Sequence, residues 1–183
     1  MKITTFALLI AVGLSQPFHA HAADFELTTE QQREVVSRFA MLYSNLNPDQ
    51  RAFALPLIAN AIDGNLPMRD PQRGIEVRQF RAAPNETLAM RVRWLQELGT
   101  DGPSVQDTQA MLPMLVTGMG CKDESVREIV NAGIKIRIDV ESLKGQSLAT
   151  TVLDAPTCNK VAASVEDQLD RLGVDDVSER GAD

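Results

Sequence analysis

The stretch Gly133–Cys158, GIKIRIDVESLKGQSLATTVLDAPTC, gives the clearest signal of the fold. Apolar Ile134, Ile136, Ile138 and Val140 alternate with charged residues, a pattern typical of a strand with one buried face. Lys144-Gly145 predicts a turn, after which Leu148, Thr150 and Val152 continue a returning strand. We therefore expect a β-hairpin that ends at Cys158.

A second hairpin is expected upstream. Ile75 and Val77 alternate with charge, Ala-Pro-Asn-Glu forms a turn, and Leu88, Met90, Val92 and Trp94 alternate with Ala89, Arg91 and Arg93. The face opposite the apolar side chains is rich in arginine, and one interpretation is a solvated sheet face. The other is a landing site for acidic groups of a partner. The candidate partner-binding residues are Arg78, Arg81, Arg91 and Arg93.

Helical periodicity accounts for most of the remaining chain. Helices are predicted over 28–46, 48–63, 104–119, 123–133 and 159–172. In the second of these helices the expected buried stripe is Phe53, Leu57, Ile58, Ala61 and Ile62. Together these elements predict an α+β fold: a four-stranded, mostly antiparallel sheet made from two β-hairpins, with helices packed on one face.

The N-terminus has the pattern of a cleavable signal peptide. A basic start at Lys2 precedes the nine-residue apolar run Phe6–Leu14, and small residues at Ala20 and Ala22 suit signal peptidase. A membrane span needs about 20 apolar residues, so no stable membrane anchor is expected. The predicted organisation is a signal peptide over 1–22, a single α+β domain over 23–172 and an acidic disordered tail over 173–183. We expect the protein in the periplasm or secreted.

Charge and histidine content exclude several classes of function. After loss of Lys2 the mature chain has 25 acidic and 17 basic residues, a net charge of −8 that disfavours nucleic acid and anionic lipid. His19 and His21 are the only histidines, and both lie in the signal peptide. Serine–histidine and cysteine–histidine catalysis and histidine metal sites are therefore excluded. We expect no catalytic residue and no cofactor, with a histidine-free hydrolase as the enzymatic alternative.

Two further features bear on metals and redox state. Cys121 and Cys158 would both reach an oxidising compartment, which predicts the disulfide Cys121–Cys158 over a two-thiol metal site or free thiols. The methionines 111, 114 and 119 suggest either a thioether copper site or a soft core or contact surface. Without a nearby histidine, and with leucine and valine between the methionines, the core or contact surface is favoured and no metal is expected.

The arrangement of these motifs resembles a known group of proteins. Leu66-Pro67 leads through Gly74 into the first hairpin, and the block Cys121–Cys158 contains a short helix, Gly133, an alternating basic strand and the Gly145 turn. This resembles the disulfide-bonded AspS-like pilotins of type II secretion, and an exported family described as quorum-sensing-regulated virulence factors. The resemblance covers about 28–158. It implies an exported α+β protein that binds another protein.

One difference from those pilotins affects the expected role. They are lipoproteins that use their lipid to carry a secretin subunit to the outer membrane, whereas no lipidation cysteine follows the apolar run here. We therefore expect a non-enzymatic protein-binding protein, an accessory or chaperone-like factor for a secretion or envelope component. Its partner would be a protein or peptide. The alternative is a periplasmic inhibitor or immunity protein that neutralises a toxin or hydrolase.

Overall fold

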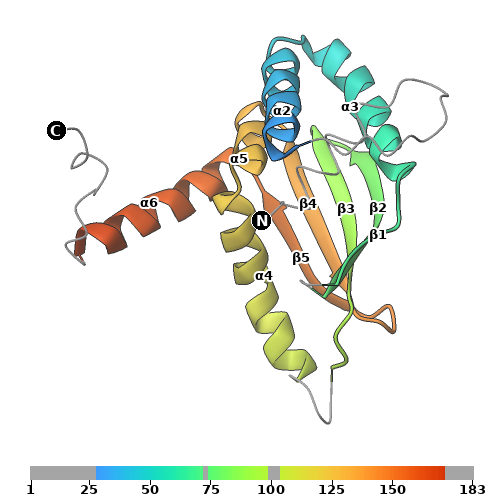
Figure 1. Cartoon of the computed structure of the whole chain (residues 1–183), viewed down its shortest axis with the longest axis vertical. Coiled ribbons are helices and arrows are strands. Elements are labelled where there is room, and N and C mark those ends of the chain that lie inside the picture. The colour runs from blue at the N-terminus through green and yellow to red at the C-terminus, as the bar shows by residue number, and fades with distance from the viewer. Residues whose placement is uncertain (1–27, 72–73, 99–103, 172–183) are drawn as a thin grey trace.

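A computed structural model describes residues 28–71, 74–98 and 104–171, so the predicted signal peptide and tail lie outside the described residues. The helices gather on one side of a single sheet and around one of its ends (Figure 1). In chain order the elements are α2 (Thr29–Ser44), α3 (Pro48–Asp63), β1 (Met68–Asp70), β2 (Ile75–Ala83), β3 (Thr87–Trp94), α4 (Val105–Lys122), α5 (Glu124–Asn131), β4 (Lys135–Glu141), β5 (Ser147–Leu153) and α6 (Ala155–Arg171).

The first two helices begin with reciprocal side-chain caps. The Thr28 hydroxyl accepts a hydrogen bond from the Gln31 amide at 3.2 Å, and the Gln31 side chain accepts one from the Thr28 amide at 2.8 Å. Asn47 and Gln50 form the same arrangement at the start of α3, with Pro48 in its first turn. These bonds satisfy amides that have no partner within the helix. The predicted starts of both helices are confirmed.

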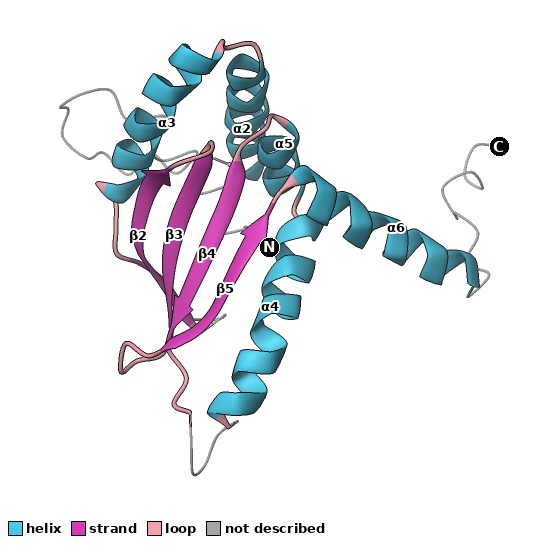
Figure 2. Cartoon of the chain, turned by 180° about the vertical axis from the view of Figure 1, so that it is seen from behind, coloured by secondary structure: helices cyan, strands magenta, loops and turns pink. Residues whose placement is uncertain are grey.

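The sheet has five strands in the order β1-β2-β3-β4-β5, and the strands β2 to β5 lie side by side in Figure 2. The two predicted antiparallel hairpins, β2–β3 and β4–β5, are present. The predicted row of β5 needs correction, because Thr150 and Val152 are exposed and the core side is formed by Thr151 and Leu153. The predicted number of strands was wrong, because the three-residue β1 pairs antiparallel with β2. The hairpins meet through a parallel β3–β4 pair, so the sheet is mixed. The helices α4 and α5 provide the long crossover that a parallel connection requires.

One face of the sheet forms the core with the helices. Leu88 and Ile136, neighbours across the parallel pair, are both fully buried. A bulge between Val77 and Gln79 shifts the alternation in β2, so that Phe80 is buried. The same core includes Val36 and Tyr43 of α2 and a buried row on α3, which packs against β2. These side chains form one continuous core.

The predicted buried face of α3 needs correction. Ile58 and Ile62 are buried as expected, but Phe53 is 72% exposed and Leu57 is 55% exposed, and Ala61 is exposed. Leu55 and Ala59 are buried instead. The helix is apolar on several sides, so its periodicity alone did not identify the side that packs on the sheet.

The predicted disulfide is present and joins the end of α4 to the first turn of α6. Cys121 and Cys158 are both buried, with their Cα atoms 4.8 Å apart. Next to it α4 approaches β5 closely, because a Cβ atom on Gly120 would lie 2.5 Å from a methyl carbon of Leu153. The disulfide therefore lies where a helix, a strand and the start of the last helix meet.

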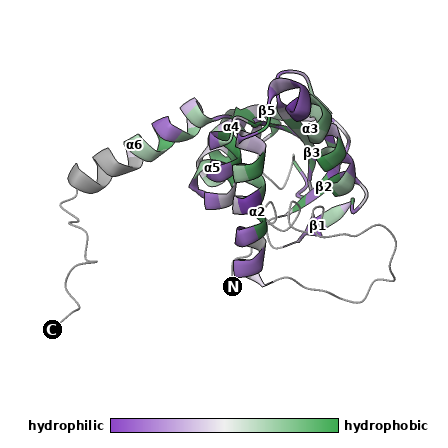
Figure 3. Ribbon diagram, turned by 90° about the horizontal axis from the view of Figure 1, so that it is seen from above, coloured by the Kyte–Doolittle hydropathy of each residue, from purple (hydrophilic) through white to green (hydrophobic). Residues whose placement is uncertain are grey.

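The last helix starts earlier than predicted, at Ala155. The Asp154 side chain accepts a hydrogen bond from the Thr157 amide at 2.9 Å, and the hydrogen bonds from Thr157 hold the pKa of Asp154 below its ordinary value. Beyond the disulfide, α6 extends away from the rest of the chain (Figure 3). The body of the protein therefore contacts mainly the first part of this helix.

Candidate protein-binding site

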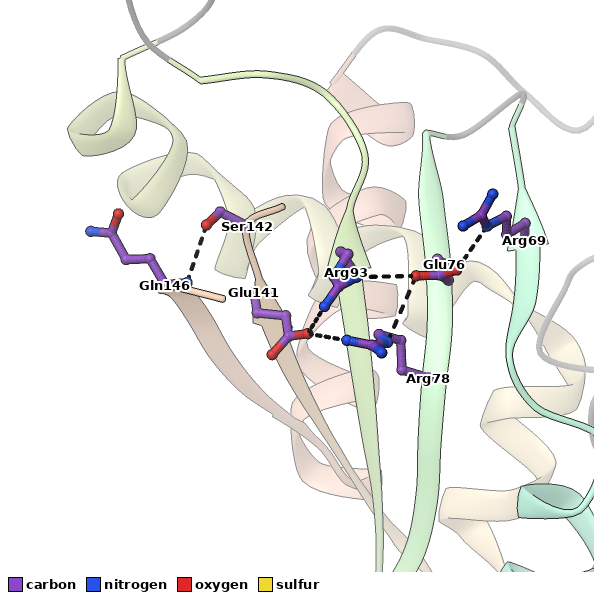
Figure 4. Close-up of polar contacts among 7 residues, drawn as sticks. All are labelled: Arg69, Glu76, Arg78, Arg93, Glu141, Ser142 and Gln146. Atoms are coloured by element: carbon purple, nitrogen blue, oxygen red, sulfur yellow. Dashed lines mark hydrogen bonds and ion pairs between the residues drawn. The ribbon is translucent and has the colours of Figure 1, made fainter. Parts of the chain in front are cut away.

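The four candidate arginines lie on two neighbouring strands, on the sheet face opposite the core. In the β2–β3 register Arg91 lies opposite Gln79, Arg93 opposite Glu76, and Arg81 opposite Ala89. Arg78 occupies the bulge of β2 and has no opposite residue. Figure 4 shows part of this face, with the helices behind the strands. The sheet therefore brings all four candidate residues to one surface.

Glu76 and Glu141 hold two of the four arginines in a network of ion pairs (Figure 4). Glu76 Oε2 lies 3.8 Å from Arg78 Nε and 3.7 Å from Arg93 Nη1. Glu141 Oε1 lies 3.6 Å from Arg78 Nη1 and 3.4 Å from Arg93 Nη2. On the far side Arg69 Nε donates a hydrogen bond of 2.7 Å to Glu76 Oε1. The two carboxylates thus fix the positions of three guanidinium groups.

Glu76 is the buried centre of this network, with its side chain only 5% exposed. The hydrogen bond from Arg69 lowers the pKa of Glu76 below its ordinary value, and the positive charges of Arg69, Arg78 and Arg93 act in the same direction. Burial opposes these effects by raising the pKa. Because the arginines lower the pKa by more than burial raises it, Glu76 is ionised at neutral pH and remains a hydrogen-bond acceptor for its three partners.

Arg81 and Arg91 differ from the other two candidates. Both are exposed, and neither forms an ion pair with another part of the chain that the structure describes. Asp139, next to Arg91 in the β3–β4 register, already pairs with Arg137 at 3.1 Å and accepts a hydrogen bond from Thr150. We call the five residues of this face the arginine surface: Arg69, Arg78, Arg81, Arg91 and Arg93. With Glu76 and Glu141 included, this surface has a net charge of +3.

Sequence reasoning missed both carboxylates of the network. Glu76 alternates with Val77 in the first hairpin, so its position on the arginine side could have been read from the pattern. Glu141 lies in the other hairpin, and only the parallel pairing of β3 with β4 places it opposite Arg93. The network therefore depends on a contact between hairpins that no local pattern indicates.

A second exposed surface lies on α4. Met111, Met114, Leu115 and Met119 are exposed, whereas Leu112 is buried. The methionines therefore do not belong to the core, which leaves the predicted contact surface as their structural setting. Within the described ranges, no three histidine, cysteine, aspartate or glutamate side chains lie close enough to hold a metal ion. The absence of a metal site stays a prediction.

None of the helices over 28–71, 74–98 and 104–171 is both long and apolar enough to cross a membrane.

Comparisons with known proteins give structural matches alone. No protein-family model matches the chain, and no curated protein sequence matches it. The chain is similar to the type 2 secretion pilotin EpsS from Vibrio vulnificus, with 17% identity over 60% of this chain and 93% of that chain and a TM-score of 0.45. It is also similar to the type II secretion pilotin AspS from Vibrio cholerae, with 17% identity over 65% and 99% and a TM-score of 0.45.

A third similar structure is a Pseudomonas aeruginosa protein described as secreted, with 15% identity over 60% of this chain and 94% of that chain and a TM-score of 0.47. The similar solved structures thus include the pilotins that the sequence resembles.

Proposed function

We propose that this protein is a non-enzymatic, exported factor that binds another protein through the arginine surface. The main observation behind the proposal is that the charge of this surface is opposite in sign to the net charge of the chain. A net charge of +3 is concentrated on one sheet face of a mature chain whose predicted net charge is −8. Such a patch would orient an acidic segment of a partner and raise its association rate.

The two groups of arginines contribute differently to such binding. Arg78 and Arg93 are held by Glu76 and Glu141, so they lose little side-chain freedom when a partner binds. Arg81 and Arg91 supply the unpaired charge and can form bidentate bonds with carboxylates. The surface therefore combines a fixed platform with two accessible charged groups, an arrangement suited to acidic side chains of a folded or extended partner.

The proposed location is the periplasm or the exterior of the cell. A buried disulfide between Cys121 and Cys158 is consistent with an oxidising compartment. Within that compartment, the proposed role is that of an accessory or chaperone-like factor for a secretion or envelope component, as the resemblance to pilotins implies. Identification of the bound partner separates this role from that of an inhibitor, whose target would be a toxin or hydrolase that loses activity in the complex.

The test is the double variant Arg81→Glu with Arg91→Glu. Arg93 is left unchanged because Arg93→Glu would place a third carboxylate beside Glu76 and Glu141. The matched control is Lys144→Glu with Lys160→Glu, which makes the same change of charge at two exposed positions outside the sheet face. Immobilised mature proteins would be exposed to an envelope extract, and bound proteins identified by mass spectrometry at low and high salt.

We expect the wild type and the control to retain the same partner, and the double variant to lose it by about tenfold or more. Binding should weaken as salt increases, because exposed charges are screened. Thermal unfolding of the double variant should stay close to that of wild type. A partner that binds the double variant as tightly as the wild type would show that the arginine surface is only a solvated face.

A further inference from the structure

The exposed side of α4 forms a continuous apolar stripe. We define the α4 stripe as Met111, Met114, Leu115, Gly118 and Met119, in which each residue has another member three or four positions away on the same side of the helix. Met114, at 71% exposed, is its most exposed side chain. A contiguous apolar patch of this kind on a charged protein usually marks a contact with another molecule.

Gly118 forms a notch in the α4 stripe. An added Cβ atom would have no neighbour within 4 Å, so the contacts of this chain do not require glycine at this position. The nearby Gly120 differs, because Leu153 would clash with its Cβ. Beside Gly118 lies an apolar hollow of about 360 Å³, lined by Pro113, Met114, Thr117 and Val161. Glycine inside a helix is less stable than alanine, and close approach of another chain would explain its presence.

The α4 stripe is complementary to itself when two copies of α4 run antiparallel. A two-fold axis between Met114 and Leu115 leaves Met111 and Gly118 equally far from the axis, on opposite sides. Met111 of each copy then lies over the Gly118 notch of the other. The same axis pairs Asp107 with Lys122, because these residues are also equidistant from it. An isologous contact requires this reciprocity.

We propose that the α4 stripe is an antiparallel homodimer interface, with Met111 seated at Gly118 of the second copy and Asp107 facing its Lys122. Charge complementarity supports a second copy as the occupant. Asp107 lies in the first turn of α4 and Lys122 in the last, and both are exposed. Neither has an ion-pair partner among the residues that the structure describes. An antiparallel pair gives both residues a partner, whereas a parallel pair would bring like charges together.

The dimer would be weak and reversible. A contact between two helices buries less than the roughly 800 Å² per partner of a standard stable interface. We therefore expect a dissociation constant in the micromolar range or above. The α4 stripe is separate from the arginine surface, so dimerisation would leave the arginine surface of each copy free. The two arginine surfaces of one dimer would together strengthen binding to a partner with repeated acidic segments.

The experiment is sedimentation equilibrium of the mature, disulfide-bonded protein over a range of about 5 μM to 1 mM, which brackets the expected dissociation constant. The variant Gly118→Leu fills the notch, and Gln106→Leu is its matched control at an exposed position of α4 outside the stripe. Asp107→Lys and Lys122→Asp each place like charges together across the interface, and the double variant restores opposite charges. Lys144→Asp controls for the change of net charge in Lys122→Asp. Circular dichroism would verify that each variant is folded.

We expect the wild type and both controls to approach twice the monomer mass as concentration rises. Gly118→Leu should abolish dimerisation within the range tested. Each single charge reversal should weaken the dimer by about threefold to tenfold, since symmetry includes the pair twice, and the double variant should recover to within about threefold of wild type.

Three results would overturn the proposal: a monomer at every concentration, a dimer unaffected by Gly118→Leu, or a charge swap that fails to recover. If the α4 stripe instead binds a different protein, this chain stays a monomer at every concentration, which overturns the proposal. None of the results depends on the arginine surface, so failure here leaves the proposed function untouched.

Discussion

The two hairpins of the sheet have the same alternating pattern but very different outer faces. On the core side Leu88 of the first hairpin and Ile136 of the second are equally buried. On the outer side the first hairpin has the carboxylate of Glu76 almost fully buried among arginines. The second has the pair Arg137–Asp139, with side chains 34% and 31% exposed. Alternation therefore predicts the buried side of β3 and β4, while the environment of each outer charge depends on its neighbours across the sheet.

The disulfide is the largest expected difference between the hairpins, because it encloses only the second one. Replacing Cys121 and Cys158 together by alanine should lower the free energy of unfolding by about 4 kcal/mol, as the lost cross-link spans 37 residues. Urea unfolding followed by circular dichroism measures this change. A loss below about 1 kcal/mol would mean that the disulfide adds little to the packing of α4, β5 and α6.

Truncating a buried side chain on the core side should destabilise the protein equally in either hairpin. Leu88→Ala and Ile136→Ala each remove a fully buried side chain, and each should cost about 3 kcal/mol in the free energy of unfolding. The two values should agree within about 1 kcal/mol, because the residues are neighbours in the β3–β4 register. Urea unfolding of the two variants in parallel makes the comparison. A much smaller loss for one of them would place the centre of the core on the other hairpin.

The outer side should give the smallest effects, and here the hairpins should differ. Glu76→Gln removes the buried negative charge that contacts three arginines. This change should lower the free energy of unfolding by about 2 kcal/mol at pH 7. Asp139→Asn, in the exposed pair, should cost less than about 1 kcal/mol. Denaturant unfolding at neutral pH measures both variants. Equal losses would show that burial of Glu76 adds nothing to its ion pairs.

The effect of Glu76 should also depend on pH. Because its folded-state pKa is lowered from an ordinary value of 4.5, its stabilising contribution is present above that value and is lost as the pH falls through the folded-state pKa. The difference in unfolding free energy between wild type and Glu76→Gln should therefore shrink between pH 7 and pH 3. A difference that stays constant over this range would contradict the lowered pKa.

Several local features followed directly from the sequence. The starts of the first two helices follow from local residue spacing, and the presence of both hairpins follows from alternation. Other features could not be read in this way. The strand β1 is only three residues long, too short for alternation to be recognised. On α3, apolar residues occur on the buried and the exposed side, so Phe53 was assigned to the wrong one.

The sequence by itself determined the starts of the first two helices, the core-facing side of β3 and β4 and the disulfide between its two cysteines, because these depend on short-range spacing or on composition. The tertiary structure alone decided the parallel β3–β4 pairing and the fifth strand. It also separated the arginines held by Glu76 and Glu141 from the unpaired Arg81 and Arg91. The β3–β4 pairing and the contacts of Glu141 join segments far apart in the chain, and the energies of such contacts depend on distance and burial, which residue spacing does not encode.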